Sequence, residues 1–212
     1  FSRESPPDTQ PQRVLGDIRS AWRPISVEDV KFAIKERKGT SPGIDSVTCE
    51  QLGKVPVWFL VGYYNCVLWG QANPDVLKRN RTILIPKAGQ TVPDPSKFRP
   101  ITISSVVSRV LHGILAERIT SVAQFNGIQR GFIKADGCLE NVLTLEHVLR
   151  EGWNKHHTVK LASLDVANAF PSVSWESIWR SLANFQAPPA LIGYLRNVYE
   201  GSTTQLDIKN YR

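Results

Sequence analysis

Residues 158–170, TVKLASLDVANAF, contain the feature that decides the fold class. The mainly apolar run at 158–164 predicts a β-strand, and Asp165 follows it directly. A carboxylate at the end of a strand suits a divalent cation, because hard cations prefer oxygen ligands. Phe170 follows five positions later, where its ring would pack against a bound sugar and exclude a 2′-hydroxyl. In the alternative interpretation, Asp165 caps a helix and Phe170 belongs to the core.

Two segments further upstream carry a Lys and an Arg that would act together. Residues 81–87 (RTILIPK) and 98–103 predict the two strands of a hairpin, with Lys87 on the first and Arg99 on the second. The two cations would converge on a triphosphate, Lys as a point charge and Arg as a bidentate fork. Either residue alone is more often an ordinary surface residue, so this hypothesis depends on the pairing of the strands.

The positive charge of the chain is uneven. The 212 residues include 26 Lys and Arg against 19 Asp and Glu, a formal net charge of +7. Between residues 78 and 118 only Asp94 and Glu117 are acidic, whereas eight residues are basic: Lys78, Arg79, Arg81, Lys87, Lys97, Arg99, Arg109 and Arg118. A basic surface of this size favours a phosphate-rich partner such as nucleic acid or a nucleotide. The alternative is a solvated basic face without a partner.

The composition excludes several classes of protein. Hydrophobic residues make up 42% of the chain, which is enough for a folded core and argues against a wholly disordered protein. The sequence has no run of 18 apolar residues, so it predicts no membrane span. Its three cysteines are far apart and predict free thiols in a reducing compartment rather than a disulfide framework or a zinc site.

The rest of the chain predicts helices and turns around these strands. Residues 1–24 are rich in Pro and polar residues and predict an extended lead-in, while residues 26–29 resemble a capping box that opens a helix ending near Gly39. Residues 39–45 predict a turn. Further helices are expected at 57–70, 105–123, 138–151, 175–184 and 189–199, loops at 90–96 and 127–137, and a last strand at 203–208. The predicted fold class is therefore α+β.

Four motifs occur in a recognisable order. They are GTSPGID at 39–45, RTILIPKAG with DPSKFRPITISSVVSRVLHGILAERI at 81–119, QRGFIKADGCLENVLTLEHVLREG at 129–152, and SLDVANAFPSVSWESI at 163–178. Together they resemble the reverse transcriptase domain of non-LTR (LINE-like) retrotransposons, over roughly residues 25–205. The third and fourth motifs resemble most the branch that inserts site-specifically into ribosomal DNA. A group II intron maturase has a related motif pattern and is the nearest alternative.

The resemblance implies a right-hand polymerase fold of fingers, palm and thumb. Residues 25–155 would form the fingers and the start of the palm. Residues 156–212 would form a partial palm with the first catalytic motif, and the palm would be incomplete and the thumb missing. The stretches at 39–45 and 129–141 would shape the fingers near the template.

The resemblance also implies roles for single residues. Asp165 matches the first metal-binding, catalytic aspartate, and Val166 the residue whose backbone carbonyl also faces a metal. Phe170 matches the steric gate that selects deoxynucleotides. Lys87 and Arg99 match the residues that hold the incoming triphosphate. The other basic residues expected to contact nucleic acid are Arg79, Arg81 and Arg109.

One departure from the family pattern limits the expected activity. The second catalytic motif, Tyr/Phe-x-Asp-Asp, does not occur in these 212 residues, and no two Asp are adjacent. The chain also starts at Phe1 and contains no Met, as expected for an interior piece or a processed product. We therefore expect a fragment of an RNA-directed DNA polymerase that is inactive by itself.

In the complete enzyme the resemblance implies two Mg²⁺ ions and two-metal nucleotidyl transfer. The expected partners are an RNA template, a DNA primer and deoxynucleoside triphosphates, and the expected location is the nucleus, with a ribonucleoprotein passing through the cytoplasm. Two other hypotheses are a truncated, non-catalytic nucleic-acid-binding relic and an interaction protein without a nucleic-acid partner. The clustered basic charge disfavours the second of these.

Overall fold

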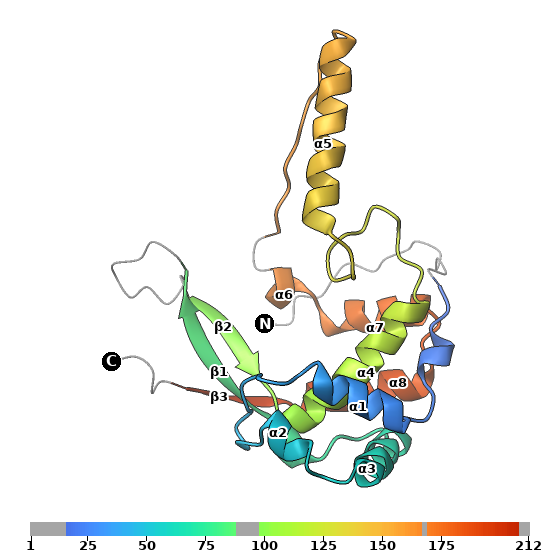
Figure 1. The fold of residues 1–212 in the computed structure, drawn as a ribbon, viewed down its shortest axis with the longest axis vertical. Coiled ribbons are helices and arrows are strands. Elements are labelled where there is room, and N and C mark those ends of the chain that lie inside the picture. The colour runs from blue at the N-terminus through green and yellow to red at the C-terminus, as the bar shows by residue number, and fades with distance from the viewer. Residues whose placement is uncertain (1–15, 88–97, 167–168, 208–212) are drawn as a thin grey trace. The chain divides into compact units, whose positions relative to one another are not determined.

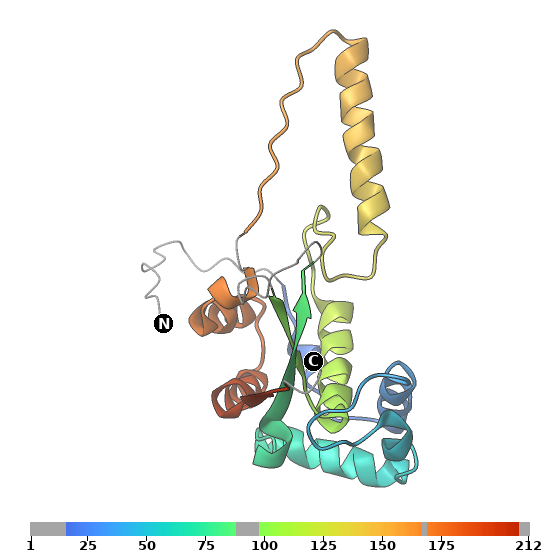
Figure 2. The same ribbon diagram turned by 90° about the vertical axis from the view of Figure 1, so that its left-hand side faces the viewer.

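The structure, a computed structural model, describes residues 16–87, 98–166 and 169–207 (Figures 1 and 2). By packing, the chain divides into two compact units. The sheet unit comprises residues 17–122 and 186–212, and the α5 unit comprises residues 1–16 and 123–185. Because these units follow packing alone, the expected boundary between fingers and palm near residue 155 stays a prediction.

The sheet unit contains three strands in the order β2-β1-β3. β1 (Arg79–Pro86) pairs antiparallel with β2 (Phe98–Ile103), which confirms the predicted hairpin, and parallel with β3 (Thr203–Leu206). The Thr82 hydroxyl lies 2.8 Å from the hydroxyl of Thr102 and 2.7 Å from that of Thr204, so hydrogen bonds link side chains across all three strands. The predicted loop at 90–96 and the last residue of the predicted strand at 203–208 lie outside the described residues.

Helices pack around α4 (Val106–Val122), which matches the helix predicted at 105–123. α1 (Val27–Lys35), α2 (Cys49–Leu52) and the 3₁₀ helix η1 (Arg19–Ala21) contact α4, while α3 (Val57–Gly70) contacts α1 and α8 (Pro189–Gly201). A second 3₁₀ helix, η2 (Asp75–Lys78), leads into β1. The core between the helices is formed by Val30, Ala33, Leu60, Tyr64, Leu68, Val106, Val110, Leu111, Ile114, Leu115, Leu191 and Tyr194.

The start of α1 is fixed by local and by distant contacts. The Ser26 hydroxyl accepts a hydrogen bond from the Asp29 N–H, and the Asp29 carboxylate accepts one from the Ser26 N–H, which confirms the predicted capping box. Arg118 is buried and donates to Asp29 at 2.7 Å and to the carbonyls of Arg23 and Pro24. Burial favours a raised pKa for Asp29, but the hydrogen bonds from Ser26 and Arg118 outweigh it and keep that pKa below its ordinary value.

The expected extended lead-in at 1–24 is wrong where the structure describes it. Residues 19–21 form η1, and Ile18 and Ala21 are only 1% and 2% exposed. Apolar residues of this segment pack against α4, and this burial outweighs the extended tendency that Pro and polar neighbours suggest. Residues 1–15 lie outside the described part of the chain.

The α5 unit contains α5 (Gly137–Asn154), α6 (Ala169–Ser172) and α7 (Trp175–Asn184), and the first and last match predicted helices. The strand predicted at 158–164 is wrong: residues 158–166 form an extended segment that runs back along α5 without pairing (Figures 1 and 2). A β-strand requires backbone hydrogen bonds to a neighbour, and the described strands pair only with one another. Val159 instead packs on Gly152, where an added Cβ would lie 2.3 Å from Val159 Cγ2.

Candidate functional site

Asp165 lies near the end of the extended segment of the α5 unit. Its side chain is exposed, and its Oδ1 accepts a hydrogen bond of 2.9 Å from the backbone N–H of Val166. The described part of α6 starts at Ala169, four residues later. The carboxylate is therefore exposed to solvent, with its Oδ1 engaged by the neighbouring backbone N–H.

Phe170 lies in α6 of the same unit and is 80% exposed. Its ring makes an edge-to-face contact with Phe132, which is 91% exposed, with a centroid separation of 6.0 Å and an interplanar angle of 81°. Such an arrangement is a favourable one for two aromatic rings. The alternative assignment of Phe170 to the core does not hold in this structure, because most of the ring surface is open.

Lys87 and Arg99 lie at the end of the hairpin where the chain passes from β1 to β2, in the sheet unit. Arg99 pairs with Ile85, and Lys87 follows β1 two residues beyond Ile85. Side chains alternate between the two faces of a strand, so this register places Lys87 and Arg99 on the same face as diagonal neighbours. Both are exposed. The two cations thus share one face, as the hypothesis of a common phosphate ligand requires.

Arg81 and Arg109 hold the loop at residues 39–45. Arg81 Nε donates to the Pro42 carbonyl at 3.0 Å, and Arg109 Nη2 donates to the Ser41 carbonyl at 2.5 Å. Arg81 also forms an ion pair of 3.4 Å with Asp207. Burial and the nearby positive charge of Arg37 hold the pKa of Arg109 below its ordinary value. Both guanidinium groups therefore position this loop, and their contact with nucleic acid stays a prediction.

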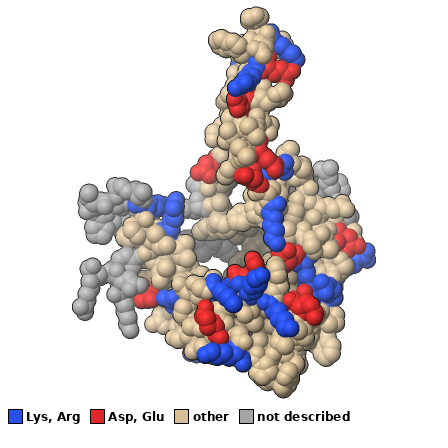
Figure 3. Space-filling model, in the orientation of Figure 1, with Lys and Arg blue, Asp and Glu red and all other residues tan. Residues whose placement is uncertain are grey.

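The basic surface predicted over residues 78–118 is wrong for two of its members. Lys78 is 7% exposed and forms an ion pair of 3.1 Å with Asp75. Arg118 is 5% exposed and forms an ion pair with Asp29 of α1. Charged side chains are buried only when partners compensate for lost hydration, and sequence patterns do not show those distant partners. Arg79 remains exposed at the start of β1. On the face of the sheet unit seen in Figure 3, basic and acidic side chains alternate.

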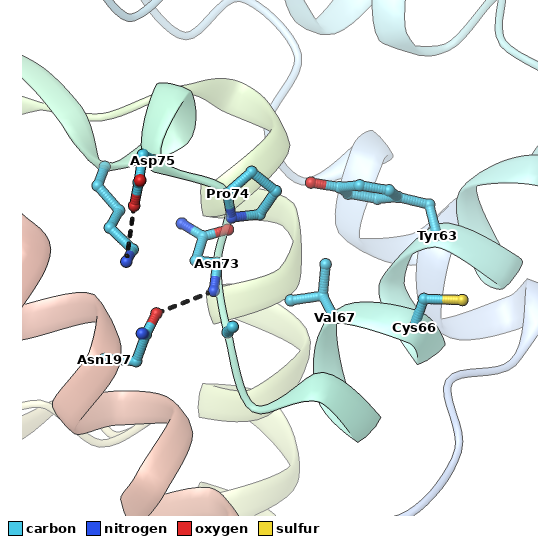
Figure 4. A pocket seen from close by; sticks show the side chains of 9 residues that line it. Tyr63, Cys66, Val67, Asn73, Pro74, Asp75 and Asn197 are labelled. Carbon is cyan, nitrogen blue, oxygen red and sulfur yellow. Dashed lines mark hydrogen bonds and ion pairs between the residues drawn. The ribbon is translucent and has the colours of Figure 1, made fainter.

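A pocket of about 510 Å³ lies between α3 and the segment that leads into β1. Figure 4 shows Tyr63 and Val67 of α3 on one side and Asn73, Pro74 and Asp75 on the other. The Asn73 N–H donates to Asn197 Oδ1 at 3.1 Å, which ties the pocket wall to α8. None of the predicted nucleotide-binding residues lines this pocket.

The described residues do not form a complete magnesium site. Across 16–87, 98–166 and 169–207, no three His, Cys, Asp or Glu side chains come together as ligands for a metal ion. Asp165 supplies one exposed carboxylate, whereas Mg²⁺ needs several oxygen ligands in near-octahedral geometry. Two Mg²⁺ ions therefore do not fit these residues by themselves. In the same part of the chain, no helix has the length and apolar character needed to cross a membrane.

Comparison with known proteins assigns the chain to a family. Residues 85–211, more than half of the chain, match the family described as reverse transcriptase (RNA-dependent DNA polymerase). The chain belongs to the reverse transcriptase family. This range contains Lys87, Arg99, Asp165 and Phe170, and the resemblance inferred from the four sequence motifs is confirmed.

Similar proteins come from retrotransposable elements. The Pol polyprotein of the type-2 element R2DM of Drosophila melanogaster is 35% identical over 190 residues, which cover 90% of this chain and 18% of that protein. The Pol polyprotein of the type-1 element R2 of Nasonia vitripennis is also 35% identical, over 92% of the chain and 19% of that protein. A probable RNA-directed DNA polymerase of the Drosophila transposon BS is 26% identical over 196 residues. The chain thus spans about a fifth of the length of these reverse transcriptase relatives.

Proposed function

We propose that the chain is part of an RNA-directed DNA polymerase of a non-LTR retrotransposon of the R2 type. The observation that carries this proposal is the family match, because its range contains every residue expected to bind the nucleotide. The whole protein would copy an RNA template into DNA from a DNA primer, using deoxynucleoside triphosphates. In that protein the chain would supply the fingers and part of the palm of a right-hand polymerase.

Asp165 is the proposed metal ligand and catalytic carboxylate. Its exposure supports this role, because a metal ligand must be reachable by the nucleotide that the metal binds. The remaining ligands of the two proposed Mg²⁺ ions would come from the Val166 carbonyl and from residues outside the described part of the chain. Hard oxygen donors of this kind are the usual ligands of Mg²⁺.

Lys87 and Arg99 are proposed to bind the triphosphate, and Phe170 to contact the sugar. The shared face of Lys87 and Arg99 supports binding of one polyanion by both, since Arg can form two parallel hydrogen bonds to phosphate and Lys adds a mobile charge. The open ring of Phe170 supports a steric contact, because a ring buried in a core could not meet a ligand. Arg79, Arg81 and Arg109 remain proposed contacts to the nucleic acid, and the nucleus remains the proposed location.

Primer extension tests the proposed activity. The full-length polypeptide that contains this chain is expected to incorporate labelled deoxynucleotides on a primed RNA template with Mg²⁺. Asp165→Asn keeps the shape of the side chain and removes its charge, so it should abolish incorporation while the protein stays folded. The 212-residue chain alone should show none, because it carries one of the required carboxylates. Extension by the Asp165→Asn protein, or by the 212-residue chain, would contradict the proposal.

A further inference from the structure

α3 is a helix without charged residues that is only half buried. Its 14 residues, VWFLVGYYNCVLWG, include no Asp, Glu, Lys or Arg. Leu60, Tyr64 and Leu68 face the core of the sheet unit. On the opposite side Trp58 is 71%, Phe59 55% and Trp69 77% exposed. A helix that is apolar all round is normally covered on all sides, and an exposed apolar face marks a surface for a partner.

The exposed residues of α3 form one continuous face. At 100° per residue, Trp58, Gly62, Cys66 and Trp69 follow one another along the same side of the helix, with Phe59 beside them. Gly62 lies in the middle, and a Cβ added there would have no atom within 4 Å. Large rings at both ends and small residues between them leave a shallow depression into which a second backbone can approach closely.

The pocket described above lies along one edge of this face. Cys66 and Val67 line it from α3, and Asn73 and Pro74 form the far wall (Figure 4). Asn73 is 4% exposed, and its Nδ2 donates to the Ser108 hydroxyl at 3.3 Å, so the far wall is anchored to α4. An apolar side chain of a segment lying on α3 would fit between these walls.

We propose that this α3 face, formed by Trp58, Phe59, Gly62, Cys66 and Trp69 with the adjoining pocket, is the docking surface for an apolar segment of the same polypeptide outside residues 1–212. Docking of such a segment is separate from the proposed polymerase function and does not depend on catalysis. The α3 side of this surface carries no charge although the chain is basic, and the charged residues that line the pocket, Lys78 and Asp75, pair with each other at 3.1 Å. The surface therefore matches an apolar protein segment better than a phosphate group.

The size of the face favours a tethered occupant over a second copy of the chain. At these exposed fractions the three rings offer roughly 400 Å², since one large aromatic side chain buries about 150–250 Å². A stable interface between separate proteins needs about 800 Å² on each partner. A tethered segment binds at a high effective concentration and needs less area. The relatives have the length for such a segment, because the chain covers only 18% and 19% of the two R2 proteins.

Cysteine labelling tests the proposal directly, because the three free thiols report on different surfaces. Cys66 lies on the α3 face, Cys138 is exposed on α5, and Cys49 is buried and has a raised pKa because of its burial. In the 212-residue chain, alkylation of Cys66 should be as fast as that of Cys138, and Cys49 should be slow. In the full-length polypeptide, alkylation of Cys66 should slow by about tenfold or more relative to Cys138, because it then requires the segment to open.

Variants on the face should reverse this protection. Trp69→Glu places a charge on the face, and Gly62→Gln places a side chain in the depression, and neither change meets the core of the sheet unit. Both should restore fast alkylation of Cys66 in the full-length polypeptide. Trp153→Glu, at a ring that is 82% exposed on α5, is the matched control and should leave the protection intact.

Four results would overturn the proposal. Equal alkylation of Cys66 in both proteins would show an uncovered face, and protection in the 212-residue chain that increases with concentration would show a second copy. Concentration-independent protection in that chain would place the cover within residues 1–212. Protection that appears only when RNA is added would assign the face to nucleic acid. Alkylation does not require polymerase activity, so failure of this proposal is separate from failure of the proposed function.

Discussion

Gly43 is held where the 39–45 loop crosses the start of α4. A Cβ at this position would lie 2.8 Å from the backbone of Ser105, which cannot move without shifting the helix. We predict that Gly43→Ala lowers the free energy of unfolding by about 1–3 kcal/mol, because overpacking forces the backbone apart. Gly62→Ala is the matched control: it meets no atom and should raise that free energy by roughly 0.5–1 kcal/mol. Equal urea midpoints for both variants would refute this account of Gly43.

We predict that His112 makes the stability of the sheet unit depend on pH. Its ring nitrogen lies 3.0 Å from the Tyr194 hydroxyl, and burial together with the positive charge of Arg37 lowers its pKa to about 4. As pH falls through 6.5, His112 takes up a proton in the unfolded chain but stays neutral in the folded one. Stability is therefore lost between pH 6.5 and about 4, by at most about 3 kcal/mol.

Urea unfolding from pH 7 to pH 4.5 measures this effect. Asp29 does not interfere in this range of pH. Its pKa lies below the ordinary value, so the stability that its ionised carboxylate contributes is lost only in more acidic solution. His112→Gln should flatten the dependence of the unfolding free energy on pH, whatever its effect on the stability at pH 7. The same slope in wild type and variant would mean that His112 does not titrate as its position implies.

At the scale of elements, the β1–β2 hairpin is the part of the chain expected to bind phosphate. The 212-residue chain should bind single-stranded RNA weakly, with an affinity that falls as salt rises. Removing Lys87 and Arg99 together should reduce the slope of log affinity against log salt by about one for each lost phosphate contact. Lys31→Ala with Lys35→Ala removes the same charge from exposed positions on α1 and should leave the slope nearly unchanged. If both double variants show the same slope of log affinity against log salt, the hairpin is not part of the RNA-binding surface.

The elements that sequence patterns predicted well are those with local causes. The capping box of Ser26 and Asp29, the apolar stripe of α4 and the hairpin strands all depend on residues close in sequence. The strand expected at 158–164 failed because a strand needs a partner, and nothing in the segment itself shows whether a partner lies beside it. The candidate site shows the same limit. The motifs identify Asp165 and Phe170 as candidates, but whether these side chains are exposed depends on the folded structure.

At the scale of the whole molecule, contacts between distant segments decide what the sequence could not show. Arg81 reaches Pro42 across 39 residues, Arg118 reaches Arg23 across 95, and β3 returns to pair with β1. Through these contacts Arg118 is buried and Arg81 is engaged within the protein, although the distribution of charge along the sequence predicts that both belong to a binding surface. Loop-closing contacts of this kind leave no periodic signal in sequence, because each depends on the complete fold.

The proposal that most needs a test is that Asp165 and Phe170 contact the nucleotide in the full-length polypeptide. Loss of activity in an Asp165 variant has several causes, but a change in sugar preference requires contact with the sugar. Phe170 is exposed and its described ring contact is with Phe132, so Phe170→Ala should lower stability by no more than about 1.5 kcal/mol. Removing a steric misfit worth about 1–3 kcal/mol should raise the use of ribonucleotides by roughly fivefold to over a hundredfold.

The deciding measurement is the ratio of kcat/KM for a deoxynucleotide to that for the matching ribonucleotide, in the full-length polypeptide and in its Phe170→Ala variant. Phe132→Ala is the control, because it removes the neighbouring ring and leaves Phe170 in place. The account predicts that the ratio falls at least about fivefold in Phe170→Ala and much less in Phe132→Ala. An unchanged ratio in Phe170→Ala, with both activities retained or both reduced together, would contradict it.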